Sequence, residues 1–229
     1  MSGRPAGGRG RTAVALLSGG LDSTVAVALW LEAGGSVALC LTFDYGQRAA
    51  ARETSAAAAF CRRRGLPHRA LALPWLGELA GQRGSALVGE GTALPTGTLQ
   101  RPGDERSAQA VWVPARNAVF VAAAGAFAET VGAGTVVAGF NREEAATFPD
   151  NSAAFVAAAT AFLALGAQPP VGVDSPTLAM DKAAIVAAAR RLGIAEGDVW
   201  SCYRGGERPC GVCESCLRSR RAWAAGAEA

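Results

Sequence analysis

The stretch 17–24, with the sequence LSGGLDST, contains the residue types most suggestive of ligand binding. Two glycines let a backbone approach a ligand closely, and the free N–H groups of a following helix would favour a phosphate. The stretch lacks both the Gly-Lys-Ser/Thr of a Walker A loop and the three spaced glycines of a dinucleotide fingerprint. Asp22 would repel a phosphate unless it capped the helix or held Mg²⁺. We therefore predict a nucleotide-phosphate site, with a plain strand-to-helix turn as the alternative.

A second stretch holds Cys202, Cys210, Cys213 and Cys216 in the pattern C-x7-C-x2-C-x2-C. Four thiolates this close match the closed, tetrahedral coordination of a structural Zn²⁺ ion. The spacing alone does not separate zinc from an iron–sulfur cluster, and a disulfide pair is the other alternative. No apolar signal segment is evident at the start of the chain, so we expect reduced thiols, a cytoplasmic location and a zinc site.

Lys182 is the only lysine among 22 basic residues. It follows Met180-Asp181, where we expect a helix to begin after a strand end. A compact ammonium suits a phosphate or an acyl-adenylate at a place where a guanidinium would not fit. We predict that Lys182 is a catalytic residue, the alternative being that an arginine-rich chain has retained one lysine by chance.

Composition excludes several classes of protein. His68 is the only histidine, so no metal site has two histidine ligands. The net charge of +3 is too small to predict a nucleic-acid partner, and no run of ~18 apolar residues predicts a membrane span. Half of the residues are hydrophobic and alanine is the commonest, which favours closely packed helices over an all-β fold.

The elements that must position these residues follow from hydrophobic runs. Strands are predicted over 12–18, 37–43, 68–73, 135–139 and 171–173, and helices over 23–32, 47–64, 118–131, 152–165, 181–192 and 214–225. This alternation predicts an α/β fold, with a parallel sheet, helices on both faces and a ligand site at the carboxyl ends of the strands. Residues 74–110 are predicted to be a long functional or mobile loop, and 141–150 a polar loop.

We divide the chain into a disordered tail (1–11), a nucleotide and substrate domain (12–199) and a small zinc module with a terminal helix (200–229). SGGLDS after the first strand resembles the PP-loop ATP pyrophosphatase superfamily. With LTFDYGQR (41–48), VPARN (113–117) and the cysteine stretch from SCY at 201 to Cys216, residues 12–223 resemble the QueC family of queuosine and archaeosine precursor biosynthesis.

The resemblance implies an adenine-nucleotide α-hydrolase type of fold and a carbon–nitrogen ligase. Members convert 7-carboxy-7-deazaguanine and ammonia to the nitrile with ATP, through adenylated carboxylate and amide intermediates. No motif supplies a glutaminase cysteine with a histidine partner, so ammonia is expected to be free. The resemblance also suggests a homodimer that binds small molecules, with no direct nucleic-acid or membrane partner.

Carried over by position, the motifs give three sets of expected site residues. Mg²⁺-ATP is expected to contact Leu17, Ser18, Gly19, Gly20, Leu21, Asp22, Ser23, Thr24, Thr42 and Phe43. Catalytic roles are expected for Asp22, Arg116 and Lys182. Substrate contacts are expected from Gln47, Arg48, Asn117, Asn141 and Asp150.

Simple structural roles are the alternatives, such as helix solvation by Gln47 and Arg48 and helix capping by Asn117 or Asp150. Asp150 lies in TFPDNS (147–152), where many members have GYPDCR, so substrate identity is less firmly implied than ATP use. A carboxylate there matches the adjacent N–H donors of a guanine-like edge. Rival functions are another PP-loop enzyme, such as a tRNA thiolase or a QueC-like enzyme with a different substrate, and a zinc-ribbon nucleic-acid binder.

Overall fold

The computed structural model describes residues 11–97 and 105–225, so most of the predicted tail lies outside the described residues. One parallel sheet has the strand order β3-β2-β1-β4-β5. Its strands are β1 (Thr12–Leu16), β2 (Ser36–Asp44), β3 (His68–Ala72), β4 (Thr135–Val137) and β5 (Gly172–Asp174). The strand order reverses between β1 and β4, and such a point opens a ligand crevice at the carboxyl ends of the strands. The predicted α/β class is confirmed.

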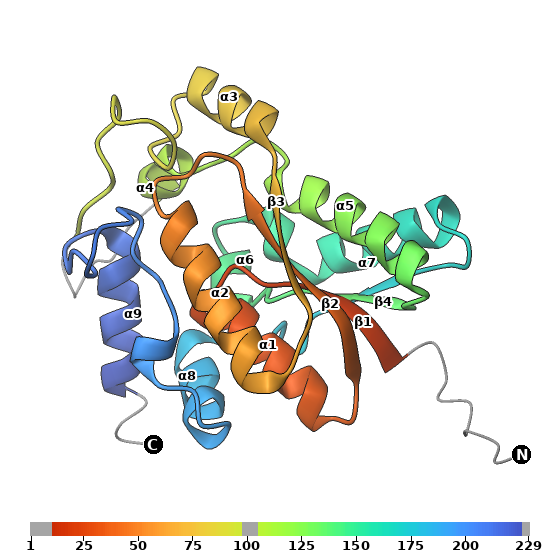
Figure 1. The fold of residues 1–229 in the computed structure, drawn as a ribbon. Helices are drawn as coiled ribbons and strands as arrows, with labels where there is room; N and C mark the ends of the chain where they lie inside the picture. Colours follow the sequence, from red (N-terminus) through yellow and green to blue (C-terminus); the bar gives the residue numbers. More distant parts are fainter. Residues whose placement is uncertain (1–10, 98–104, 226–229) are drawn as a thin grey trace, which may run out of the picture.

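Helices cover both faces of the sheet (Figure 1). One layer contains α1 (Leu21–Glu32), α2 (Ala50–Arg64) and α8 (Lys182–Arg191), and the other contains α5 (Arg116–Val131) and α7 (Ala153–Gly166). β1 alternates between the two cores: Ala13 and Ala15 pack in the first, and Val14 packs in the second. Every one of these strand residues is fully buried, so β1 is the centre of the molecule and its carboxyl end the natural place for a site.

The prediction of a long loop over 74–110 is wrong, because this segment contains two helices, α3 (Pro74–Gln82) and α4 (Glu105–Ala110). The glycines at 77 and 81 have a low helix propensity, so the sequence of α3 indicated a turn and not a helix. A Cβ on Gly77 would lie 1.9 Å from the carbonyl oxygen of Tyr45, so this glycine lets α3 pack directly on the chain that leaves β2. The predicted polar loop 141–150 likewise contains the short helix α6 (Arg142–Ala145). Two 3-10 turns complete the connections, at Pro149–Asn151 and Glu196–Asp198.

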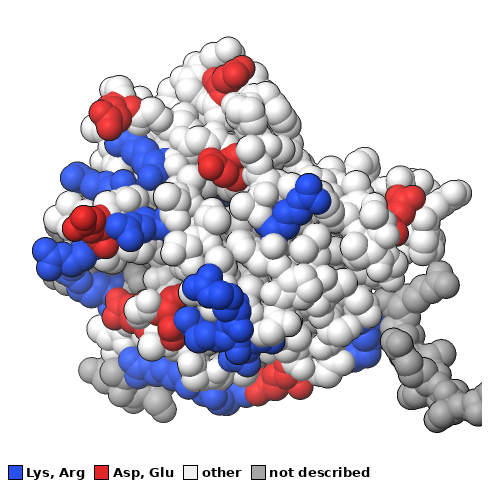
Figure 2. Space-filling view, viewed as in Figure 1, with Lys and Arg blue, Asp and Glu red and all other residues white. Residues whose placement is uncertain are grey.

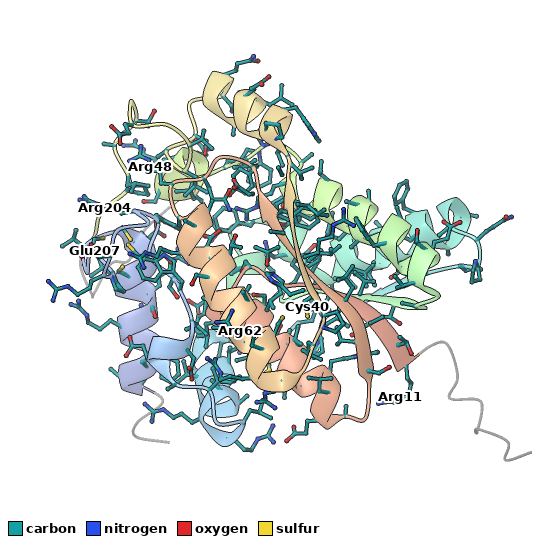
Figure 3. The ribbon with its side chains drawn as sticks, viewed as in Figure 1. Arg11, Cys40, Arg48, Arg62, Arg204 and Glu207 are labelled. Carbon is teal, nitrogen blue, oxygen red and sulfur yellow. The ribbon has the colours of Figure 1, made fainter. Side chains whose placement is uncertain are left out.

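The cysteine-rich segment and α9 (Glu214–Ala225) pack against the main body. The N–H of Trp200 donates to the carbonyl oxygen of Gly19 over 2.8 Å, and that of Glu214 to Pro95 over 3.1 Å. A Cβ on Gly205 would lie 2.0 Å from the Arg48 carbonyl oxygen, and Arg48 and Arg204 lie in the same part of the molecule (Figure 3). This module, residues 200–225 of the described chain, is therefore built onto the end of the sheet where the crevice lies.

The surface has two contrasting areas. Charged side chains of both signs, with more basic than acidic ones, gather over α8, α9 and the end of α2 (Figure 2). The area around α5 carries few charges. No helix in the described part of the chain is both long and apolar enough to cross a bilayer.

Candidate active site

The loop between β1 and α1 has the backbone of an anion site. Gly19 adopts φ +77°, and a Cβ there would lie 2.4 Å from the carbonyl oxygen of Glu53 and 2.8 Å from the nitrogen of Ala57. Both the left-handed conformation and the contact with α2 therefore require glycine. Gly20 is the N-cap of α1 and supplies no side-chain cap. The N–H groups and the positive dipole end of the first turn are thus available to a ligand.

Hydroxyl groups line the same loop. The Oγ atoms of Ser18 and Ser23 lie 3.0 Å apart, and the Ser18 N–H donates to Ser23 Oγ over 3.2 Å. Thr24 is fully buried, and its Oγ1 has no hydrogen-bond partner within the described residues. Asp22 and Ser23 lie in the first turn of α1 and neither is its N-cap, so the plain-turn alternative, in which one of them caps the helix, does not describe this loop.

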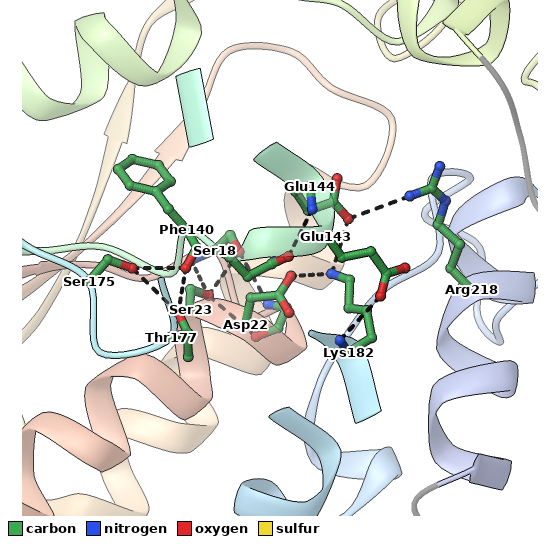
Figure 4. Close-up of polar contacts among 12 residues, drawn as sticks. Ser18, Asp22, Ser23, Phe140, Glu143, Glu144, Ser175, Thr177, Lys182 and Arg218 are labelled. Atoms are coloured by element: carbon green, nitrogen blue, oxygen red, sulfur yellow. Dashed lines mark hydrogen bonds and ion pairs between the residues drawn. The ribbon is translucent and has the colours of Figure 1, made fainter. Parts of the chain in front are cut away.

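Five charged residues, which we call the loop end, alternate in sign beside this helix start: Asp22, Lys182, Glu144, Arg218 and Glu214. Figure 4 shows the first four of them. Lys182 Nζ lies 2.5 Å from Asp22 Oδ2 and 3.1 Å from Glu144 Oε1. Arg218 lies 3.8 Å from Glu144 and 2.6 Å from Glu214, one turn earlier on α9. An unbroken row of ion pairs thus joins the loop after β1 to the cysteine-rich module.

Ion pairing favours the charged forms of Lys182 and Glu144, whereas burial raises the pKa of Asp22 in spite of the charge of Lys182. Burial works against the charge of Lys182, but Asp22 and Glu144 outweigh it and raise the pKa of the ammonium. Burial likewise opposes the charge of Glu144, but Lys182 and Arg218 outweigh it and lower the pKa of this carboxyl. Asp22 Oδ1 is buried and receives no hydrogen bond within the described residues, so one carboxylate oxygen is open to a cation.

The opposite part of the site, the aromatic end, consists of Phe43, Tyr45, Glu53, Arg116 and Phe120. The rings of Phe43 and Phe120 stack with centroids 4.2 Å apart and an interplanar angle of 8°. Arg116 Nη1 donates to the hydroxyl of Tyr45 over 3.5 Å. Burial raises the pKa of Glu53, and the hydrogen bond from Gln47 and the charge of Arg116 offset this only in part.

A cavity of about 310 Å³ joins the two ends. Its lining includes residues of the module, among them Trp200, Tyr203 and Arg218. The structure brings most of the expected site residues to this wall, and the following line it: Leu17, Ser18, Gly20, Leu21, Asp22, Ser23, Phe43, Gln47, Arg116, Asn117 and Lys182.

Six expected residues do not line the cavity: Gly19, Thr24, Thr42, Arg48, Asn141 and Asp150. Thr42 donates to the Leu17 carbonyl oxygen over 2.5 Å and so supports the loop from behind. Arg48 donates to the carbonyl oxygen of Thr92 over 2.6 Å. Asn141 caps α6 by accepting from the N–H of Glu144. These side chains position the wall of the cavity.

Sequence reasoning did not single out Glu53, Glu144, Tyr203, Glu214 and Arg218 as site residues. Glu53 follows Gln47 by six positions in LTFDYGQR-x4-E, and Glu144 lies at the third helical position after its N-cap Asn141. These local signals indicate a helix start, and only the folded chain shows that both carboxylates face one cavity. Nothing in the local pattern distinguishes Arg218 from its neighbouring arginines.

The four cysteines of the module form one cluster. Their sulfur atoms all lie within 4.8 Å of one another, and those of Cys210 and Cys216 are 4.0 Å apart. Tetrahedral Zn–S bonds of ~2.3 Å require S–S distances of about 3.8 Å, so a small contraction fits a metal ion. Backbone N–H groups of Arg204 and Cys210 point at Cys202 Sγ, each over 3.4 Å, as expected for thiolate ligands. The cluster can hold a metal.

Comparison with known proteins gives a consistent family. A family model described as "Queuosine biosynthesis protein QueC" matches residues 12–226. The chain is 48% identical over 213 residues to the 7-cyano-7-deazaguanine synthase of Pelotomaculum thermopropionicum, and the match covers 91% of this chain and 95% of that protein. The family resemblance seen in the motifs is therefore confirmed.

Solved structures show the same fold in more distant proteins. NMN synthetase from Francisella tularensis matches with a TM-score of 0.51 at 13% identity, over 96% of this chain and 85% of that one. The U34-tRNA thiolase NcsA from Methanococcus maripaludis matches with a TM-score of 0.50 at 17% identity, over 96% of this chain and 67% of that one. At these identities the likeness concerns the fold alone.

Proposed function

The chain belongs to the QueC family, and from that premise we propose that it converts 7-carboxy-7-deazaguanine, ammonia and ATP to 7-cyano-7-deazaguanine. The observation that carries the proposal is one cavity that joins an uncapped helix start, the ammonium of Lys182 and an aromatic wall. Such a cavity offers separate places for a triphosphate and a planar base. The clustered thiols are consistent with a reducing compartment, so we place the reaction in the cytoplasm.

We propose that ATP binds with its phosphates on the loop 17–24. At the loop end, Lys182 and Arg218 are already paired with three carboxylates, those of Asp22, Glu144 and Glu214, so no positive charge is left over. A triphosphate adds negative charge and must either displace a carboxylate or bring a cation. Mg²⁺ held at Asp22 Oδ1 would supply that cation and leave Lys182 free to turn toward the phosphates.

The reaction needs two activations of the same carbon. In the first, a carboxylate oxygen of the substrate attacks the α-phosphate of ATP, pyrophosphate leaves, and ammonia then displaces AMP to give the amide. In the second, the amide oxygen attacks a second ATP in the same way. The activated oxygen departs with AMP and the nitrogen loses its protons, which leaves the nitrile. We assign the developing phosphate charge to Lys182 and the substrate carboxylate to Arg116, whose guanidinium is suited to it.

We propose zinc as the metal of Cys202, Cys210, Cys213 and Cys216, in a structural role. All four thiolates occupy the coordination sphere, so no position is open for water or substrate. When bound, the ion supplies cross-linking only. Its effect on the site is to hold Trp200, Tyr203 and Arg218 in the cavity wall. Elemental analysis of anaerobically purified protein should give about one zinc per chain, and iron in its place would contradict this assignment.

We further propose a homodimer that forms through α7. This helix exposes Phe162 to 58% and Leu165 to 91%, and its exposed Ala154, Ala158 and Ala161 add to the apolar surface. Contiguous apolar patches of this kind are typical of interaction sites. Light scattering should give twice the chain mass for the native protein and the chain mass for Leu165→Glu, whereas a native monomer would refute the proposal.

The activity is tested directly by incubating the purified protein with ATP, Mg²⁺, ammonium and 7-carboxy-7-deazaguanine, followed by mass spectrometry. We expect the amide to appear first and the nitrile to follow, with AMP released in step. Reactions without ATP or without ammonium are the controls and should give neither product. Failure to form either product in the complete mixture would overturn the assignment in favour of a QueC-like enzyme with a different substrate.

A further inference from the structure

Glu53 is a carboxylate residue of the cavity wall. The reaction steps proposed above do not involve it. It lies near the start of α2, is partly buried and faces the cavity. Its Oε2 accepts a hydrogen bond of 2.8 Å from Gln47 Nε2. Within the described residues this is the only hydrogen bond of the Glu53 side chain, and that side chain forms no ion pair. Desolvating a carboxylate with so few partners is costly, so a side chain kept in this state favours a role toward a ligand.

Gln47 fixes the orientation of Glu53. Its second amide hydrogen goes to the carbonyl oxygen of Phe43 over 3.0 Å, and its Oε1 accepts from the N–H of Tyr45 over 2.9 Å. Gln47 is only 5% exposed, and both N–H donors and the oxygen of its side-chain amide take part in hydrogen bonds. Gln47 therefore acts as a positioning residue that holds the Glu53 carboxylate still at the cavity wall, with acceptor sites left on both oxygens.

Glu53 lies outside the ion-pair row of the loop end. The charges that act on it are those of Arg116 and Asp44, and neither Asp22 nor Lys182 is among them. It shares the aromatic end of the cavity with the stacked rings of Phe43 and Phe120. A planar heterocycle can pack on such an apolar, aromatic wall, and a fixed carboxylate beside that wall can then accept hydrogen bonds only from the edge of the ring.

We propose that Glu53 recognises the edge of the base that carries N1–H and the 2-amino group, and that it makes the enzyme specific for guanine-like bases. This inference rests on the proposed function, because it takes a deazaguanine as the substrate. The two adjacent N–H donors of that edge match the two oxygens of one carboxylate, and hydrogen bonds to an ionised acceptor are among the stronger ones in proteins.

Asp150, for which the sequence left this task and helix capping as alternatives, is placed differently. It lies in the 3-10 turn Pro149–Asn151 and is not part of the cavity wall. Its carboxylate accepts from Asn151 Nδ2 over 3.3 Å, and its carbonyl oxygen accepts from Asn117 Nδ2 over 3.2 Å. Asp150 thus ties this turn to the start of α5, and Glu53 is the carboxylate that the base can reach.

The test combines one variant with one altered substrate. Wild type, Glu53→Gln and the matched control Glu129→Gln, an exposed glutamate on α5, are assayed with 7-carboxy-7-deazaguanine and with its analogue lacking the 2-amino group. Wild type and the control should prefer the full substrate by about 10- to 100-fold in kcat/KM. Glu53→Gln should reduce that preference to a few-fold, raise KM for the base and leave the Kd for ATP within about twofold.

Each other outcome counts against the proposal in its own way. An unchanged preference in Glu53→Gln would reject this role, and a rise in the Kd for ATP alone would assign Glu53 to the ribose instead. If Glu53→Gln fails to bind ATP because it does not fold, the wild-type comparison still decides, since equal use of the two substrates rules out recognition of the 2-amino group. If wild type makes neither amide nor nitrile, the proposed function fails and this inference fails with it.

Discussion

At the loop end of the cavity, cations and carboxylates pair with each other directly, whereas at the aromatic end the carboxylate of Glu53 is held by a neutral amide. Lys182, Asp22 and Glu144 are joined by distances of 2.5 and 3.1 Å. The Glu53 side chain has one hydrogen bond of 2.8 Å, from Gln47. A ligand must therefore exchange partners at the loop end, while at the aromatic end it can add to a fixed acceptor.

This difference separates two tasks. A site that exchanges ion pairs suits a charged co-substrate whose phosphates leave in each round. A fixed hydrogen-bond acceptor suits recognition, because an analogue without the matching donor leaves the carboxylate desolvated and unpaired. We expect variants of the loop end to act mainly on ATP use and turnover, and variants of the aromatic end to act on the choice of base.

Lys182→Met should have the largest effect. The substitution removes the ammonium next to the phosphates and leaves Asp22 buried without its cation, so kcat should fall by about 100- to 1000-fold. Single-turnover and steady-state assays measure the loss. Thermal melting should also show destabilisation, because one partner of a buried pair is gone.

Arg191→Met is the control for Lys182→Met, since it removes a positive charge from the same helix at an exposed pair with Glu32. Such a surface pair contributes about 0–1 kcal/mol, so turnover should stay close to the wild-type value. Lys182→Arg sharpens the comparison, because a guanidinium keeps the charge but not the compact shape. Full turnover of Lys182→Arg at saturating ATP would show that the lysine has no special role.

Cys213→Ser should rank next, with turnover lowered by about 10- to 100-fold. Cys213 pairs as an antiparallel bridge with Thr96, and the same module is bonded to the loop after β1 through Trp200. Loss of the metal should loosen the module and with it one wall of the cavity. Elemental analysis, melting temperature and activity are measured together, and Cys61→Ala, a core cysteine outside the cluster, is the control. Full activity without metal would contradict a structural role.

Arg218→Ala should lower turnover by about tenfold while the metal is retained. Arg218 connects Glu214 to Glu144, and Glu144 in turn holds Lys182, so the arginine acts through other residues as a positioning residue. Arg218→Lys keeps the charge and should recover part of the turnover. The effect should fall on ATP-dependent steps, with an unchanged KM for the base. If KM for the base rose and the ATP-dependent steps were unchanged, Arg218 would act at the aromatic end, and the division of tasks between the two ends would be contradicted.

The sequence predicted the phosphate loop 17–24 and Lys182 better than the rest of the cavity wall, for a physical reason. Phosphate recognition needs contiguous glycines, hydroxyls and a helix start, which the stretch 17–24 shows locally. The isolated lysine was also a local signal, and Lys182 does begin α8. The aromatic end is assembled from β2, α2 and α5, so the roles of Gln47 and Glu53 depend on which side chains face each other after folding.

The same reasoning explains the missed helices. α3 contains two glycines, one of which is there because the helix touches the carbonyl oxygen of Tyr45, and a sequence pattern cannot distinguish such a contact from a turn. The sequence offered Asp150, and not Glu53, as a carboxylate that could read the base, although the two side chains have the same chemistry. Only the fold shows that Asp150 supports a turn and that Glu53 reaches the cavity.

Acidification should act on Glu53 before it acts on Glu144, with the smallest of the expected effects. Burial raises the pKa of Glu53, while Lys182 and Arg218 outweigh burial and lower that of Glu144. As the pH falls, Glu53 takes up a proton before Glu144 does, so the affinity for the base should weaken by up to about tenfold per pH unit. Calorimetric titration of the base against the protein with a non-hydrolysable ATP analogue measures this without the ionisation of ammonia interfering. In Glu53→Gln the pH dependence should disappear, and its persistence would mean that another group of the aromatic end titrates.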